Sequence, residues 1–273
     1  MKIKVKPALL NTFLIIISLA MMFPLFWMLI YSFKTYPESY NSILSLIKAP
    51  FTLNNYIDAF SSDSFIRYFF NSTFIALIVT AGNILFCTFV AYALVRKEFK
   101  GKSLLFATIA GVMIIPQHVI MIPLYRLMVN FNWINEYYSL IVPWLITPFG
   151  IYLLHQYLIK LPSDIEDAAR IDGAGNWYIL FKIVMPLCKP ILIVLGIYTF
   201  LGNWNSFLFP FLFSNTESMR TLPVGLTFYM GKQTIDWGHI MAGAGISAIP
   251  IIIVFLIFQK QIIKGITAGA IKE

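Results

Sequence analysis

Charged side chains are scarce in this sequence of 273 residues. Only 12% of the residues are Asp, Glu, Lys or Arg and 59% are hydrophobic, whereas soluble domains have about 25% charged and roughly 45–50% apolar residues. Because continuous apolar runs fit helices better than barrel strands, the composition excludes a soluble globular protein and predicts an all-α polytopic membrane protein. We expect six transmembrane helices, since six uncharged stretches are long enough to cross a bilayer: residues 8–33, 68–95, 103–125, 137–159, 190–216 and 240–259.

Ionisable residues are absent from the stretches in which many ion-driven transporters need them. Carriers driven by proton gradients keep Asp, Glu, Lys or Arg inside the membrane as relays, and the six stretches contain none. This absence disfavours a proton-driven carrier. An ATP-independent secondary carrier stays open as the less favoured alternative, because a sodium site built from carbonyl and hydroxyl oxygens needs no ionisable side chain.

The sequence also lacks motifs for catalysis, metal binding and nucleotide binding. It has no H-E-x-x-H motif, and its three histidines do not have ligand spacing on one helix: His118, His155 and His239. The run Gly101-Lys102-Ser103 is not a phosphate-binding loop, since Arg96 stands where that loop begins with glycine. The two cysteines, Cys87 and Cys188, give no disulfide framework and are predicted to be packing residues. We therefore expect no catalytic residue, no metal site and no cofactor in this chain.

Basic residues are distributed unevenly among the segments that connect the stretches. If the N-terminus is cytoplasmic, the inside segments hold 14 of the 20 Lys and Arg residues: 1–7, 96–102, 160–189 and 260–273. The positive-inside rule then places both termini in the cytoplasm. The net charge of +8 mostly reflects this bias and does not indicate nucleic-acid binding.

Uncharged polar residues do occur inside the apolar stretches. The candidates for a substrate pathway are Asn83, Gln117, Asn203, Trp204 and Asn205. Amide groups beside aromatic rings offer hydrogen-bond donors, acceptors and a stacking face, which a neutral, hydroxyl-rich solute such as a sugar requires. The alternative is that these side chains only bridge helices. Five prolines predict that the third to fifth helices are bent: Pro116, Pro123, Pro143, Pro148 and Pro210.

Residues 160–189 form a charged interruption between the fourth and fifth stretches. Ser163 followed by Glu166 predicts a helix start at which each side chain caps the other residue's backbone. Gly173 predicts that the helix stops after about two to three turns, because glycine adopts a positive φ at low cost. A second short helix is expected to end at Pro186 and to have an apolar stripe of Trp177, Leu180, Phe181 and Val184. We expect the first helix to dock in a groove of a cytosolic protein; the alternative is a connector on the membrane surface.

This charged segment resembles the "EAA" loop of the permease subunits of ABC importers, specifically the carbohydrate-uptake group that includes the maltose permeases. The resembling run covers residues 166–174 and is followed by Ile183 and Pro186. The resemblance implies the type I ABC importer permease fold and a coupling helix that sits in a cleft of a cytosolic ATPase. Asp167 stands where the family usually has Glu. The residues that the resemblance assigns to ATPase coupling are Glu166, Asp167, Ala168, Ala169, Arg170, Asp172, Gly173, Ala174 and Pro186.

Two further stretches are similar to the same family. The run Asn203-Trp204-Asn205, followed by Phe207, Leu208 and Pro210, resembles the family's fifth-helix signature. Residues 264–272 resemble the tail of its six-span subunit, where the resemblance implies ATPase contacts by Thr267, Gly269 and Lys272. The implied division is a cytoplasmic N-terminus with the first helix, an extracytoplasmic loop, a permease core and a cytoplasmic tail, at residues 1–35, 36–67, 68–263 and 264–273.

The resemblance implies a transport subunit, not an enzyme, in the cytoplasmic (inner) membrane of a prokaryote. Its implied partners are membrane lipid, a second homologous permease, two ATPase subunits that bind ATP and magnesium, and an extracytoplasmic sugar-binding protein; no nucleic acid is expected. The implied substrate is a sugar or oligosaccharide. Glycerol phosphate or a peptide is the alternative, although an anionic solute would favour Lys or Arg in the pathway, and the apolar stretches have neither.

Overall fold

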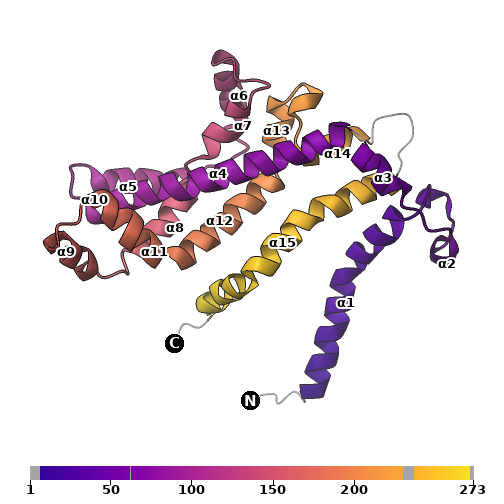
Figure 1. The fold of residues 1–273 in the computed structure, drawn as a ribbon, viewed down its shortest axis with the longest axis horizontal. Helices are drawn as coiled ribbons and strands as arrows, with labels where there is room; N and C mark the ends of the chain where they lie inside the picture. Colours follow the sequence, from indigo (N-terminus) through magenta and orange to yellow (C-terminus); the bar gives the residue numbers. More distant parts are fainter. Residues whose placement is uncertain (1–6, 62, 230–236, 271–273) are drawn as a thin grey trace. The chain divides into compact units, whose positions relative to one another are not determined.

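The computed structural model describes residues 7–61, 63–229 and 237–270, and all regular secondary structure in these residues is helical (Figure 1). The prediction of an all-α protein is therefore confirmed. The longest helices are α1 (Pro7–Ser32), α4 (Asp63–Arg96), α12 (Lys189–Trp204) and α15 (Trp237–Ala270). Shorter elements connect them: η1 (Pro37–Ser39), α2 (Ile43–Lys48), α3 (Asn54–Ser61), α5 (Lys102–Val112), α6 (Met121–Asn130), α7 (Tyr137–Ile141), η2 (Val142–Trp144), α8 (Pro148–Leu158), α9 (Asp164–Ile171), α10 (Asn176–Tyr178), η3 (Ile179–Val184), α11 (Met185–Leu187), α13 (Leu208–Phe213), η4 (Glu217–Met219) and α14 (Leu222–Tyr229).

Several helical segments are long and apolar enough to cross a membrane. In the described residues four pass by length and composition: Leu10–Ser32, Ser64–Arg96, Tyr137–Leu158 and Trp237–Gln261. A fifth counts if Asn176–Leu187 and Lys189–Trp204, which meet at a bend of 79°, form one span. The chain is thus a multi-pass membrane protein, with four or five such segments in the described residues where the sequence predicted six.

The predicted third span, residues 103–125, is not a continuous helix. Helix α5 ends at Val112, and α6 begins only at Met121. Between them the chain makes short turns, in which Met113, Ile114 and Ile115 donate to carbonyls three residues back. Pro116 then has no N–H to continue a helical ladder, whereas Pro123 is accepted because it lies in the first turn of α6. The prolines break this stretch more completely than the expected bend.

The chain forms two compact units, each with its own packing. The first comprises residues 1–66 and 225–249. In it the segment after α1 is held by buried polar side chains. Asn55 Nδ2 donates to the carbonyls of Ser32 and Lys34, both at 2.9 Å, and Lys34 Nζ donates to the carbonyl of Ala49 at 2.5 Å. These bonds satisfy carbonyls at the end of α1, just after it and just after α2.

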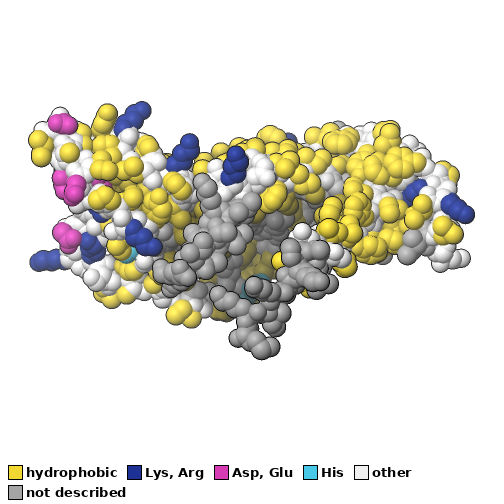
Figure 2. Space-filling view, turned by 90° about the horizontal axis from the view of Figure 1, so that it is seen from below, with side chains coloured by type: hydrophobic (Ala, Val, Ile, Leu, Met, Phe, Trp, Pro, Cys, Tyr) yellow, Lys and Arg dark blue, Asp and Glu magenta, His cyan; other side chains and the backbone are white. Residues whose placement is uncertain are grey.

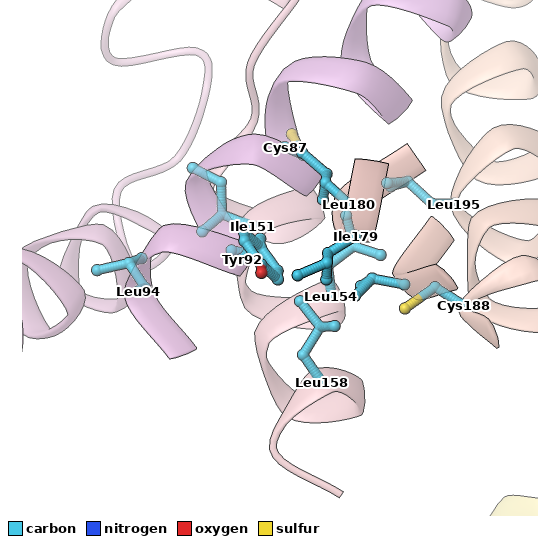
Figure 3. Packing of buried hydrophobic residues seen from close by; sticks show 12 residues of the cluster. Cys87, Tyr92, Leu94, Ile151, Leu154, Leu158, Ile179, Leu180, Cys188 and Leu195 are labelled. Carbon is cyan, nitrogen blue, oxygen red and sulfur yellow. The ribbon is translucent and has the colours of Figure 1, made fainter. Parts of the chain in front are cut away.

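The second unit comprises residues 67–224 and 250–273 and contains both candidate functional regions. One of its cores packs α4, α8 and α12 against the helical run from α10 to α11; Figure 3 shows Tyr92, Ile151 and Ile179 lying together in it. Both cysteines are free and fully buried, as expected of packing residues. The buried members of this core are Cys87, Ala91, Tyr92, Leu94, Ile151, Leu154, Leu158, Ile179, Leu180, Val184, Cys188 and Leu195.

Candidate functional site

The charged segment forms a short helix, α9, with a charge order that suits the helix dipole. Its first turn contains Asp164, Glu166 and Asp167, and its last turn contains Arg170. The predicted capping box is wrong. Ser163 has a helical φ of −76° and its side chain makes no capping hydrogen bond, since the N–H of Glu166 donates to the Ser163 carbonyl instead. The Glu166 side chain in turn bonds Tyr92 and Arg96 and not the helix start.

Glu166 instead anchors α9 to the end of α4. Its carboxylate is 3% exposed and accepts from Arg96 Nε at 2.6 Å and from the Tyr92 hydroxyl at 3.0 Å. Arg170 Nη2 lies 3.5 Å away, and Arg96 Nη2 also donates to the carbonyl of Leu161 at 2.8 Å. A buried carboxylate is tolerated only when it is paired and hydrogen-bonded. These contacts therefore fix α9 to α4, although Arg96 and Glu166 are 70 residues apart in the sequence.

Gly173 ends α9, as the sequence predicted. Its φ is +84°, in the left-handed region that favours glycine. The N–H of Gly173 donates to the carbonyl of Arg170, and the N–H of Ala174 donates to the carbonyl of Ala169 at 2.9 Å. This pair of bonds is a Schellman motif, and Ala169 and Ala174 both pack on the core of Figure 3. The chain reversal is thus set by one glycine and two alanines.

The outer side of α9 and the turn after it remain exposed. Ile171 is 88% exposed, and Ala168, Asp172 and Trp177 are also exposed. Figure 2 shows acidic and basic side chains gathered on the side of the molecule where Figure 1 draws α9. Desolvation lowers the pKa of Arg170, but the hydrogen bond to Asp167 and the electrostatic attraction of Tyr92 and Asp167 together outweigh this effect, so the pKa lies above the usual value for arginine. The end of α9 therefore presents the charged side chains of Asp167 and Arg170 beside the exposed Ile171.

The second short helix differs from the predicted stripe. Residues 179–184 are π-helical, and the buried positions are Ile179, Leu180 and Val184. A π-helical turn adds a residue and shifts the buried face, so Trp177 and Phe181 become exposed, although both rings still contact Phe89. Pro186 does not end the run. It lies inside α11, and the bend follows at Cys188.

A polar cavity of about 180 Å³, which we call the α12 cavity, brings together two of the five predicted pathway residues. Gln117 and Asn203 line it. Asn83 supports the wall from behind: its Nδ2 donates to the Trp144 carbonyl and to Thr147 Oγ1, both at 3.1 Å. The full lining is Gln117, Trp144, Thr147, Tyr198, Thr199, Gly202, Asn203, Ser206 and Phe209.

The other predicted residues lie elsewhere. Trp204 is buried and stacks on Phe200, with its edge against Phe69. Asn205 is exposed and donates to the carbonyl of Leu201. In the predicted tail, Thr267 and Gly269 fall in the last turns of α15, where the side chains are not described, and Lys272 lies outside the described residues.

Sequence reasoning missed the residues that hold these two regions in place. Arg96 is the first charge after the second apolar stretch, but nothing in the sequence pairs it with Glu166. In the cavity wall, Thr147 caps the start of α8 and Thr199 lies in α12. Only the fold brings these two threonines together. In the sequence, their one indication of a role is that they are polar residues within apolar runs.

Comparison with known proteins identifies the class to which this fold and these regions belong. Residues 83–268 match the family described as "Binding-protein-dependent transport system inner membrane component", and the chain belongs to this family. The resemblance seen in residues 166–186 is therefore confirmed, and the chain is a transporter subunit of the permease type.

Two curated relatives and one solved structure show which transporters this chain is similar to. The chain is 33% identical over 266 residues to the arabinooligosaccharides transport system permease protein AraQ of Bacillus subtilis (strain 168), covering 96% of this chain and 95% of the relative. It is 35% identical over 263 residues to the trehalose/maltose transport system permease protein MalG of Thermococcus litoralis, covering 94% of each chain. A bacterial ABC transporter involved in the import of the acidic polysaccharide alginate has the same fold, with a TM-score of 0.82 at 21% identity over 95% of this chain and 99% of that one.

Proposed function

We propose that this chain is the permease subunit of an ATP-driven, binding-protein-dependent importer that moves a sugar or oligosaccharide across the cytoplasmic membrane of a prokaryote. The observation that carries the proposal is α9, a short charged helix that is anchored to α4 by a buried ion pair while Ile171 at its end is 88% exposed. The substrate class is supported by the relatives, whose names refer to arabinooligosaccharides and to trehalose or maltose.

The proposed complex has four further subunits around this chain. They are a second homologous permease, two cytosolic ATPases that bind ATP and magnesium, and an extracytoplasmic sugar-binding protein. The family description "binding-protein-dependent" supports the last of these. This chain receives motion from the ATPases and hydrolyses nothing itself.

The proposed topology has six crossings and both termini in the cytoplasm. It is supported by the 14 of 20 Lys and Arg residues that fall in the segments assigned to the inside. In this topology the broken stretch from α5 to α6 is the third crossing, and its turns around Pro116 are protected from lipid by neighbouring protein or by a watered cavity. Helix α9 then lies on the cytoplasmic side.

The coupling residues divide into two groups by their surroundings. Exposed Asp167, Ala168 and Asp172 are available to touch an ATPase, whereas buried Glu166 and half-buried Ala169 hold α9 in place. ATP-driven closure of the ATPases displaces α9, and the Glu166–Arg96 ion pair makes α4 move with it. Such a switch requires contacts that differ between the two states, and α9 supplies them.

Two glycines in the same loop provide a matched test. Gly173 has a φ of +84° and Gly175 a φ of −73°, and an added Cβ would meet nothing within 4 Å at either position. Gly173→Val should therefore abolish uptake and the stimulation of ATP hydrolysis, because valine cannot adopt the left-handed turn, while Gly175→Val should retain both. The measurement is uptake by the complete complex in vesicles, with membrane insertion checked separately.

Deletion of residues 166–173 should have the same effect as Gly173→Val. Wild-type transport by either variant would refute the coupling role of α9. Uptake by the purified chain without ATP or partners would instead identify a secondary carrier.

A further inference from the structure

We propose that an apolar groove between α4, α12 and α15 binds an anionic phospholipid of the cytoplasmic leaflet, with the lipid phosphate at Lys189 and one acyl chain along the groove. This groove, which we call the α15 groove, has a volume of about 660 Å³ and is apolar except for Lys189 and Thr80. Its volume lies within the about 300–1,000 Å³ of ligand sites. The groove shares no lining residue with the α12 cavity, and its role depends on the proposed topology, in which residues 160–189 lie on the cytoplasmic side.

The length of the α15 groove matches the thickness of one leaflet. Along α12 the lining runs from Lys189 to Phe200, which is about 16 Å at the helical rise of about 1.5 Å per residue. One leaflet of the hydrocarbon core is about 15 Å thick, because the whole core measures about 30 Å. An acyl chain that begins at the level of Lys189 therefore reaches the middle of the bilayer near Phe200.

Lys189 gives the groove a positive end that no acidic side chain of its walls neutralises. Lys189 is exposed and makes no hydrogen bond or ion pair through its side chain with another described residue. Helices α12 and α15 contain no Asp or Glu, and α4 has only Asp63 at its opposite end. Two further exposed lysines, Lys182 and Lys260, stand within two residues of lining positions. Basic pockets between transmembrane helices on the cytoplasmic side bind anionic head groups, so a lipid phosphate complements this charge.

A phospholipid supplies both the apolar chain and the anion that the groove requires. An apolar helix of a neighbouring subunit would cover the groove, but it would bring no anion to Lys189 unless it carried an acidic residue at that level. Ionised residues are rare in membrane-spanning helices because they are costly to place there. An anionic lipid therefore matches the walls and the charge of the groove better than a second helix does.

The groove also spans the bend that precedes α12. Met185 lines it from the segment Asn176–Leu187 and Lys189 lines it from α12, and these two arms meet at an angle of 79°. A lipid in the groove contacts both arms and therefore stabilises the angle between them. Since the first arm follows α9 in the chain, the bound lipid would support the segment through which motion of α9 reaches α12.

Two matched pairs of variants test the walls and the charge of the groove. On α15, Val254 lines the groove, whereas Leu256 is 58% exposed and is not part of the lining. Val254→Trp should therefore fill the groove, and Leu256→Trp is its control. Lys189→Gln removes the positive end, and its control is Lys160→Gln, which removes an exposed lysine of the same cytoplasmic segment outside the lining.

The experiment uses the complete complex in vesicles of phosphatidylcholine. The vesicles contain a trace of either phosphatidylglycerol or phosphatidylcholine that carries a photoreactive group in its acyl chain. Illumination links the chain to the residues that it touches, and mass spectrometry of the peptides from α12 and α15 measures the yield. ATP-dependent uptake by the same wild-type complex is recorded alongside, so that failure of the lipid site is distinguished from failure of the importer function.

We expect the phosphatidylglycerol probe to label the groove residues about fivefold more than the phosphatidylcholine probe, and Lys189→Gln to remove this difference. Lys160→Gln and Leu256→Trp should label like the wild type, whereas Val254→Trp should lose most of the labelling. Equal labelling of the wild type by the two probes, or equal labelling of Val254→Trp and Leu256→Trp, would overturn the proposal. Groove residues that neither probe labels, as when a helix of the second permease covers them, would overturn it as well.

Discussion

A carboxylate as buried as that of Glu166 is stable only while its donors stay in place. Arg96 Nε and the Tyr92 hydroxyl supply two short hydrogen bonds, at 2.6 and 3.0 Å. Removing one partner of a buried ion pair costs about 3–5 kcal/mol, whereas an exposed pair is worth about 1 kcal/mol or less. The chain contains both kinds of ion pair close together in sequence: Arg96 belongs to the buried pair, and Glu98 forms an exposed pair with Lys102.

The buried ion pair between Arg96 and Glu166 predicts that a single variant is more impaired than the double variant. Arg96→Met should lower ATP-dependent uptake by roughly tenfold or more, because about 3–5 kcal/mol of anchoring is lost when Glu166 stays charged and unpaired. The double variant Arg96→Met with Glu166→Gln should recover part of this loss, since no buried charge remains. Uptake and the thermal unfolding midpoint of the complex measure the effect.

The control for this pattern is Glu98→Gln, which removes only the exposed ion pair with Lys102. It should leave uptake and the unfolding midpoint unchanged. A double variant as impaired as the sum of its single variants would show that Arg96 and Glu166 act independently and would contradict the anchor.

Among the helices, α8 packs tightly against α4 at Gly150. A Cβ added there would lie 2.8 Å from Cys87 Sγ, 2.9 Å from Thr147 Oγ1 and 3.0 Å from Asn83 Oδ1. The glycine therefore lets α8 pack on α4 and lets Thr147 cap α8 by accepting from the N–H of Gly150 at 3.2 Å. This contact also places Thr147 in the wall of the α12 cavity.

Gly150→Val should separate α4 from α8. Overpacking of this kind costs about 1–3 kcal/mol, which corresponds to a fall of roughly 2–10 °C in the unfolding midpoint. Cys87, which is fully buried, should become reactive toward a maleimide. Gly111→Val in α5 is the control, since an added Cβ there meets nothing within 4 Å; equal stability and equal thiol reactivity in both variants would contradict the close approach.

Element by element, the sequence predicts what depends on local composition and misses what depends on distant partners. The long apolar runs and the stop at Gly173 follow from hydropathy and from the freedom of glycine at positive φ. The capping box at Ser163 fails because Arg96, far away in sequence, draws the Glu166 side chain to itself. In the predicted stripe after Gly173, Leu180 and Val184 are buried as expected, but Trp177 and Phe181 are exposed, because the π-helical turn changes the period on which the prediction relied.

For the whole molecule, composition and family membership agree. The scarcity of charge predicts a polytopic helical protein, and the match of residues 83–268 places the chain in a family of transport system inner membrane components. The pairing of the α12 cavity with Asn83 was beyond sequence reasoning, because it depends on α4, α8 and α12 meeting in space. In the proposed account, α4 links this cavity to α9.

The side of the membrane on which α9 lies, and what it touches, test the central claim most directly. Ile171 is 88% exposed and both native cysteines are buried, so Ile171→Cys adds a single accessible thiol among the described residues. Asn41→Cys, at an exposed position in the loop 36–67 that the proposed topology places outside the cell, is the control. In the intact complex the thiol at position 171 should crosslink to an ATPase subunit and resist a membrane-impermeant reagent added to cells, while the thiol at position 41 should react with that reagent. Labelling of position 171 from outside the cell, or no crosslink to any ATPase, would contradict the account.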